Sequence, residues 1–228
     1  MAPAIKKFIA RGGVRQQQEK GSRISQKMRE RLFHLLLIAC FAFLFYSNSF
    51  GNFFVWNDWT LIIENYLVKD WSNLPEIFTS AFWKPLLGEP PQIYRPLVLL
   101  SFTADFLLWG LNPWGYHLSN LLLHVLNSLL VYSLMGFYTS PLTACVGSLL
   151  FAVHPIHTEA VTYISGRVEL LMSLFLLGGT VVFLATLSVG IKRLEQRMQQ
   201  DTRLRQRVRH LCMILKKGRK RQYKITKA

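Results

Sequence analysis

Long apolar stretches alternate with polar segments along this chain. Three of them, residues 32–50, 116–137 and 170–191, contain no Lys, Arg, Asp or Glu. Each is close to the roughly 20 residues that a helix needs to cross a bilayer. This pattern predicts an all-α protein, a multi-pass transmembrane helix bundle.

Two shorter apolar stretches leave the number of crossings open between four and five. Residues 96–111 are apolar apart from Asp105, and we expect them to form a further span. Residues 142–153 are only 12 positions long, which is short for a crossing. We therefore expect 142–153 to be a half-membrane or re-entrant piece that other helices bury.

The segment between the first two apolar stretches, residues 51–94, has a different composition. Aromatic residues and carboxylates alternate there with Gly, Pro and Asn. Asn73-Leu74-Pro75-Glu76 is typical of a helix start, with a cap residue followed by Pro and an acid in the first turn. Because Trp and Tyr concentrate at the membrane–water boundary, we expect short helices lying along the membrane surface.

Charge changes this picture by giving the helices an orientation. Residues 1–31 hold nine basic and two acidic residues, and residues 192–228 hold fourteen and two. Basic segments beside apolar spans favour the cytoplasmic side, so both termini are expected there, after an even number of crossings. We interpret 1–31 as a disordered cytosolic arm and 192–228 as a basic amphipathic tail, and no nucleic-acid partner is expected.

Four polar residues interrupt the apolar stretch 116–137 on a single helix face. These are His117, Asn120, His124 and Asn127. Polar side chains at membrane depth face other helices or a cavity, so interhelical hydrogen bonds are the favoured interpretation. Cys40 and Cys145 are expected to be buried as small hydrophobic residues, with no disulfide framework.

The segment from His154 to Glu169 is the richest in candidate chemistry. It places two histidines, two glutamates and Arg167 between apolar stretches, where charge is costly and needs a reason. With an even number of crossings, this segment and the loop 51–94 lie on the same, non-cytoplasmic side. They can then build one shared site.

Four short motifs in this order resemble a known family. They are Val55-Trp56-Asn57-Asp58, Tyr94-Arg95-Pro96-Leu97, Gly115-Tyr116-His117-Leu118-Ser119-Asn120 and His154-Pro155-Ile156-His157-Thr158-Glu159-Ala160-Val161. Residues 32–190 are similar to the amino-terminal membrane part of the transmembrane and tetratricopeptide-repeat proteins. Those proteins include protein O-mannosyltransferases and resemble the GT-C superfamily of membrane glycosyltransferases.

The resemblance implies transfer of a sugar from a polyprenyl- or dolichyl-phosphate donor to a protein or glycan hydroxyl on the non-cytoplasmic side. The location would be a bacterial inner membrane or the endoplasmic reticulum membrane. The acid in the first outer loop that matches the family is Asp58. Relatives often carry two acids there, whereas Asn57 precedes Asp58 in this chain.

The resemblance implies roles for seven residues, and Asp58 and Glu159 are the expected catalytic carboxylates. The expected substrate-binding residues are Arg95, Arg167, His154, His157 and Glu169. A guanidinium can hold a phosphate through paired hydrogen bonds, and a carboxylate can take the acceptor's proton. No metal site or cofactor is expected beyond the lipid-phosphate sugar substrate, and a divalent cation is not supported.

Each role has a simpler structural alternative. Asp58 could cap a helix that begins at Trp59, and Arg95 could reach lipid headgroups. Arg167 could pair with Glu159 or Glu169 inside the membrane. The enzyme function itself has a rival, because family members carry more spans and helical repeats. The chain could be a non-catalytic, truncated or split module that anchors in membrane lipids and joins a partner chain supplying the missing parts.

Overall fold

The computed structural model describes residues 2–79 and 94–200, with the single positions 206, 210 and 213. It divides into two units, Met1–Gly179 and Thr180–Ala228, and the bundle and pocket described below belong to the first. Every regular element in the described residues is helical, which confirms the predicted all-α fold. The main helices are α1 (Ala2–Tyr46), α2 (Leu74–Thr79), α4 (Pro96–Trp109), α5 (Pro113–Met135), α6 (Pro141–Val153), α7 (Thr158–Thr162) and α8 (Arg167–Gln200).

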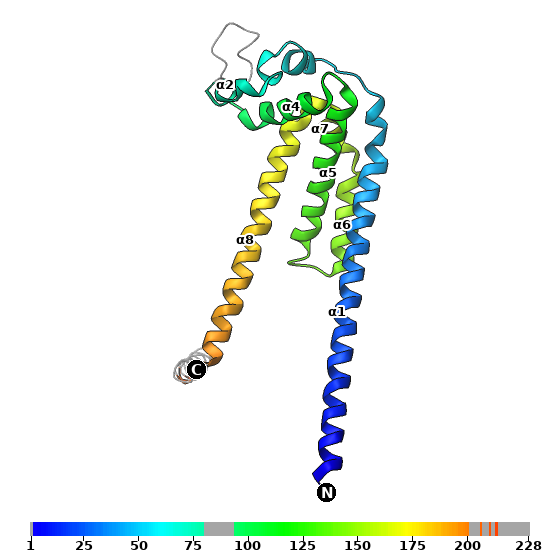
Figure 1. Cartoon of the computed structure of the whole chain (residues 1–228), viewed down its shortest axis with the longest axis vertical. Coiled ribbons are helices and arrows are strands. Elements are labelled where there is room, and N and C mark those ends of the chain that lie inside the picture. Colours follow the sequence, from blue (N-terminus) through cyan, green and yellow to red (C-terminus); the bar gives the residue numbers. More distant parts are fainter. Residues whose placement is uncertain (1, 80–93, 201–205, 207–209, 211–212, 214–228) are drawn as a thin grey trace, which may run out of the picture. The chain divides into compact units, whose positions relative to one another are not determined.

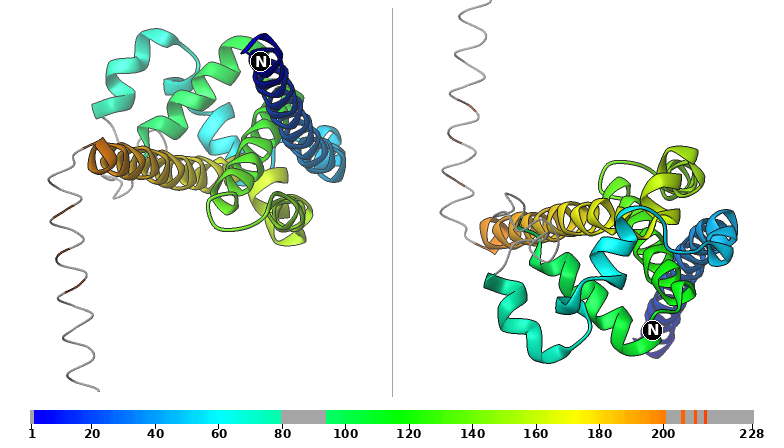
Figure 2. Two further views of the ribbon diagram at one scale, coloured as in Figure 1. Left: turned by 90° about the horizontal axis from the view of Figure 1, so that it is seen from below. Right: turned by 90° about the horizontal axis from the view of Figure 1, so that it is seen from above.

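Helices α5 and α6 pack side by side with each other and with the carboxyl-terminal part of α1 (Figures 1 and 2). Small and aromatic side chains fill the space between them. The buried members are Ile38, Ala42, Tyr132, Ala144, Cys145 and Ala152. Small residues at such contacts let helix backbones approach closely, which is how membrane helices associate.

Local sequence explains where α5 and α6 begin. Asn112 accepts a hydrogen bond from the Trp114 backbone N–H at 3.1 Å, and Ser140 accepts one from Thr143 at 3.2 Å. A proline follows each cap. Proline is suited to the first helical position because its missing N–H would have no partner there, so the cap and the proline together fix both starts.

The fourth membrane-spanning candidate differs from the one expected. Three helical stretches are long and apolar enough to cross: Ile24–Gly51, Pro113–Met135 and Ile164–Gln199. The expectation that 96–111 spans is wrong, because α4 has only 14 residues. Instead, α6 and Pro155–Thr162 together pass as one span bent by 45°. The bend lies at His154-Pro155, since a residue before proline is driven out of the helical conformation. The described residues thus hold three helices that could cross, or four if this bent pair is one span; as a re-entrant loop, the pair would match the expectation for 142–153.

Two other expectations are corrected. The polar arm at the amino terminus is not disordered in this structure, because α1 runs continuously from Ala2 into the apolar stretch. Cys145 is buried as expected, but Cys40 is exposed on α1. Most of the expected amphipathic tail, beyond residue 200, lies outside the described residues.

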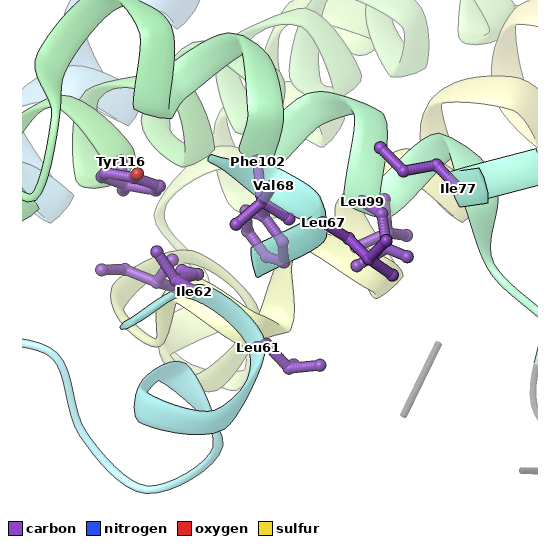
Figure 3. Close-up of a cluster of buried hydrophobic side chains, with 10 residues drawn as sticks. Leu61, Ile62, Leu67, Val68, Ile77, Leu99, Phe102 and Tyr116 are labelled. Carbon is purple, nitrogen blue, oxygen red and sulfur yellow. The ribbon is translucent and has the colours of Figure 1, made fainter. Parts of the chain in front are cut away.

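Short helical turns after α1 gather with α2 and α4 at one end of the bundle (Figure 1). The turns are Ser47–Gly51, Trp59–Ile63, Tyr66–Val68 and Trp71–Asn73. This confirms the short helices predicted for the loop as far as residue 79, and the rest of that prediction, from 80 to 93, lies outside the described residues. Two of these turns, Trp59–Ile63 and Tyr66–Val68, share one buried cluster with α2, α4, the first turn of α5 and the turn Ile164–Gly166 (Figure 3). It comprises Leu61, Ile62, Leu67, Val68, Ile77, Val98, Leu99, Phe102, Tyr116 and Ile164.

Candidate functional site

A pocket of about 160 Å³ lies where the outer loop meets the segment between α7 and α8. Its charged lining residues are Arg95, Glu159 and Glu169, all of them solvent-exposed. The other lining residues are Asn57, Leu61, Tyr163, Ser165, Gly166 and Val168. Three of the predicted site residues therefore share one pocket, although Arg95 and Glu159 are far apart in sequence.

Asp58 lies beside this pocket and does not line it. Its side chain is fully buried, and both carboxylate oxygens accept hydrogen bonds. Oδ2 accepts from the Val55 N–H at 3.0 Å, while Oδ1 accepts from the Ser165 N–H at 2.9 Å and from the Ser165 hydroxyl. Asp58 thus ties the outer loop to the segment before α8.

Burial raises the pKa of Asp58, because a charged carboxylate loses the solvation of water. The hydrogen bonds from Ser165 and Val55 and the charge of Arg167 oppose this shift only in part. Raised pKa values occur at both catalytic and structural carboxylates. Here one carboxylate oxygen closes the turn at Val55 and the other binds Ser165, which joins the two segments.

The turn that carries Asp58 has a strained residue next to the pocket. The Asp58 N–H donates to the Val55 carbonyl at 2.9 Å, which closes a four-residue turn. Trp56 in this turn has a φ of 47°, in the left-handed region that favours Gly, Asn and Asp. That conformation costs a non-glycine residue about 1–2 kcal/mol. Packing recovers little of this cost, since Trp56 is 86% exposed.

Asn57 follows Trp56 and lines the pocket. Its backbone N–H donates to the Tyr163 hydroxyl at 3.2 Å. The Tyr163 ring also contacts Trp56 edge-on, with the ring centroids 6.4 Å apart. Tyr163 and Ser165 are thus site residues that the sequence analysis missed, because a tyrosine and a serine beside charged residues give no distinctive signal.

Gly166 lets the wall of the pocket close tightly. A Cβ atom at this position would lie 2.8 Å from the carbonyl oxygens of Glu159 and Ala160. Those oxygens belong to the α7 backbone and cannot rotate away. Hence α7, which carries Glu159, rests directly on the backbone that Asp58 holds through Ser165.

Arg167 occupies the interior below the pocket, with 1% of its surface exposed. Its guanidinium forms an ion pair with Asp105 of α4. It also donates to Asn120 Oδ1 at 2.7 Å and to the Tyr116 carbonyl at 2.9 Å. The simpler alternative of a buried ion pair is therefore present, but with Asp105 and not with Glu159 or Glu169. The structure does not bring Arg167 to the pocket.

The polar face of α5 makes the interhelical hydrogen bonds that its spacing predicted. The Asn120 amide donates to the carbonyls of Tyr163 and Ile164 at 3.1 and 3.2 Å. His124 bonds to the Ala152 carbonyl at 2.9 Å, and Asn127 donates to that of Leu170 at 2.9 Å. The carbonyls of Ala152 and Tyr163 lie where α6 and α7 end, where helix carbonyls have no partner within the helix. Within the described residues, both ring nitrogens of buried His117 lack a hydrogen-bond partner.

His154 and His157 lie at the bend rather than in the pocket lining. His154 Nδ1 accepts a hydrogen bond from the Ile156 N–H at 3.2 Å, as a cap of the following turn. The His157 ring packs against Phe151, with the ring centroids 4.4 Å apart. No group of three His, Cys, Asp or Glu side chains within the described residues is arranged to hold a metal ion.

Comparison with known proteins connects this geometry to a family. The human protein O-mannosyl-transferase TMTC3 is 39% identical over 134 residues, which cover 58% of this chain. The Caenorhabditis elegans protein O-mannosyl-transferase F38B6.6 is 32% identical over 189 residues, or 79% of the chain, and Xenopus laevis tmtc2 is 38% identical over 145. The chain belongs to the TMTC family.

This membership confirms the resemblance that the four motifs predicted. The chain spans 15% of the length of the human TMTC3 protein and 26% of the C. elegans relative. No family model matches the chain, and no solved structure matches it. Apolar helices and TMTC relatives together make this a membrane protein.

Proposed function

We propose that this TMTC chain takes part in glycosyl transfer from a polyprenyl- or dolichyl-phosphate sugar to a protein hydroxyl on the non-cytoplasmic side of the membrane. The observation that carries the proposal is the pocket that joins Arg95 to Glu159 and Glu169. The pocket combines the guanidinium of Arg95, which can bind a phosphate, with the carboxylates of Glu159 and Glu169, which can accept a proton. The names of the relatives, protein O-mannosyl-transferases, support mannose as the sugar and a protein as the acceptor.

The pocket residues divide the chemistry of transfer between them. The acceptor oxygen attacks the anomeric carbon of the sugar, and the bond from that carbon to the phosphate oxygen breaks. Glu159 takes the proton of the acceptor hydroxyl as general base. Arg95 stabilises the negative charge on the departing lipid phosphate through charge-assisted hydrogen bonds. Glu169 orients the acceptor.

We assign Asp58 a positioning role in place of the base role that the resemblance implied. Both of its oxygens already accept hydrogen bonds from Val55 and Ser165, and its side chain is fully buried. Through Ser165 and Gly166 it supports the α7 backbone that carries Glu159. Arg167 likewise acts in the interior, joining α8 to α4 and α5.

Purified chain in liposomes, supplied with radiolabelled dolichyl-phosphate mannose and a Ser/Thr-rich protein acceptor, tests this function. The wild type should label the acceptor, and Glu159→Gln should slow labelling about 10²- to 10⁴-fold, the usual contribution of a general base. The matched control is Glu64→Gln, which changes an exposed acid of the outer loop that does not line the pocket. Wild-type protein that labels nothing, or undiminished labelling by Glu159→Gln, contradicts the proposal.

A further inference from the structure

Trp56 combines two properties that oppose each other in an ordinary turn. Its backbone is left-handed, with a φ of 47°, and its ring is 86% exposed. A strained backbone conformation persists when the surrounding structure fixes it, and such strain gathers at ligand sites. Burial of the ring does not stabilise this conformation, because the indole stands almost entirely in solvent.

Neighbouring tryptophans show that a membrane-surface role does not explain this backbone. Trp59 and Trp71, in the same outer loop, are 53% and 51% exposed, as interfacial aromatic residues would be. Neither has a positive φ, and among the described non-glycine residues Trp56 alone does. Two hydrogen bonds fix the turn at both ends. The Asp58 N–H donates to the Val55 carbonyl, and the Val55 N–H donates to Asp58 Oδ2.

The turn holds the Trp56 ring beside the pocket. Asn57, the next residue, lines the pocket, and Tyr163, which contacts the Trp56 ring edge-on, lines it too. The Tyr163 hydroxyl accepts the Asn57 N–H at 3.2 Å, so its own proton remains to be donated. The mouth of the pocket therefore presents an aromatic face next to hydroxyl, amide and carboxylate groups.

This combination fits one class of ligand. A pyranose ring has a face of C–H groups that packs on an aromatic ring, and a rim of hydroxyls that needs polar partners. The pocket volume of about 160 Å³ is smaller than the roughly 300–1,000 Å³ of sites for drug-sized ligands. It suits one ring and not an oligosaccharide.

We propose that Trp56 is a stacking platform that holds the pyranose ring of the sugar substrate at the mouth of this pocket. This inference deepens the proposed function and rests on it for the identity of the sugar. Tyr163 supports the platform from its edge and donates to a sugar oxygen. The strained turn fixes the backbone of Trp56 next to Asn57, which lines the pocket, and the indole contacts Tyr163, which lines it as well.

Binding of radiolabelled mannose 1-phosphate to the purified chain tests the platform. The measurement is made in detergent, where no bilayer surface is present for a tryptophan to anchor in. Trp56→Asn should weaken binding about 3- to 10-fold, the value of one aromatic contact, while Trp56→Phe retains most of it. Because Asn tolerates the left-handed region, the Tm of Trp56→Asn should equal or exceed that of the wild type.

Trp71→Asn is the control, because it removes another exposed ring of the outer loop whose neighbouring residues do not line the pocket, and it should leave binding unchanged. Inorganic phosphate should compete about equally in the wild type and in Trp56→Asn, since it has no ring to stack. The proposal is overturned if Trp56→Asn binds mannose 1-phosphate as well as the wild type. It is also overturned if the wild type binds the sugar phosphate no better than inorganic phosphate.

Two results separate this inference from the proposed function. If mannose 1-phosphate binding depends on Trp56 but the chain transfers no sugar, the stacking role is supported and the transferase role is contradicted. If Trp56→Asn still transfers sugar with an unchanged KM for the donor, the stacking role is contradicted and the transferase role stands.

Discussion

The backbone N–H of Ser165 donates a hydrogen bond to Oδ1 of Asp58 at 2.9 Å, across 107 positions of sequence. This bond joins the first outer loop to the segment between α7 and α8. Gly166, the next residue, lies against the backbone of Glu159. The position of the proposed base therefore depends on a carboxylate that does not itself reach the pocket.

Stability should depend on pH through Asp58. Its pKa is raised by burial above the ordinary value of 3.8, so the folded state holds this proton more tightly than the unfolded state. The stability that this group contributes is complete below 3.8 and falls as the pH rises through the raised pKa. Asp58→Asn lacks this titration, so its Tm relative to the wild type should rise over the same window. Thermal unfolding in detergent at a series of pH values measures the difference, and a flat or falling difference contradicts the account.

Removing one member of the Arg167–Asp105 pair should destabilise the protein strongly. Arg167→Met leaves the Asp105 carboxylate buried without its partner, which typically costs about 3–5 kcal/mol. The double variant Arg167→Met with Asp105→Leu should recover much of this loss, because no buried charge remains. Chemical unfolding of both variants measures the effect. Arg193→Met, at an exposed position of α8, is the control and should change little.

A methyl group at Gly166 should disturb both stability and transfer. Gly166→Ala places a Cβ atom 2.8 Å from two α7 carbonyl oxygens, so α7 must move. Overpacking of this kind costs about 1–3 kcal/mol, and a shift of Glu159 lowers the transfer rate. In Gly179→Ala the new Cβ meets nothing within 4 Å, and stability should be kept or slightly increased. Equal Tm values for the two variants would show that Gly166 has no special packing role.

Arg95 should act on the donor more than on the acceptor. Arg95→Gln removes the guanidinium from the pocket and should raise the KM for dolichyl-phosphate mannose about 10- to 100-fold, as expected for loss of a charged hydrogen bond. The KM for the acceptor should stay within a few-fold of the wild type. Steady-state transfer kinetics with each substrate varied separately distinguish the two. An effect on the acceptor alone would place the phosphate elsewhere.

The helical fold could be predicted from sequence because apolar length and polar spacing report on it directly. The stripe that includes Asn120 and His124 was expected to bond other helices, and it does. The expectation that 96–111 spans was wrong, because its helix is too short. Apolar length judged one segment at a time also did not show that α6 continues past a bend into Pro155–Thr162, as either a broken span or the expected re-entrant piece.

The site could be predicted in part. Charge between apolar stretches pointed to Glu159 and Glu169, and the family resemblance pointed to Arg95; these three residues share the pocket. One turn carries both Asn57, which lines the pocket, and Asp58, which is buried beside it, and no periodicity in the sequence distinguishes the two positions. The partner of Arg167 proved to be Asp105, 62 positions away. Sequence shows that a buried arginine needs an acid, but only the fold selects which one.

The central claim is that the outer loop and the α7 segment form one donor-binding pocket on the non-cytoplasmic side. Single cysteines at Asn57 and at Glu159, in a chain whose three native cysteines are replaced by serine, test it most directly. The measurement is labelling by a membrane-impermeant maleimide in sealed, oriented vesicles, with and without dolichyl-phosphate mannose. The account predicts that both positions are labelled from the non-cytoplasmic side and that the donor slows labelling at both. Labelling from opposite sides of the membrane, or labelling that the donor leaves unchanged, would contradict it.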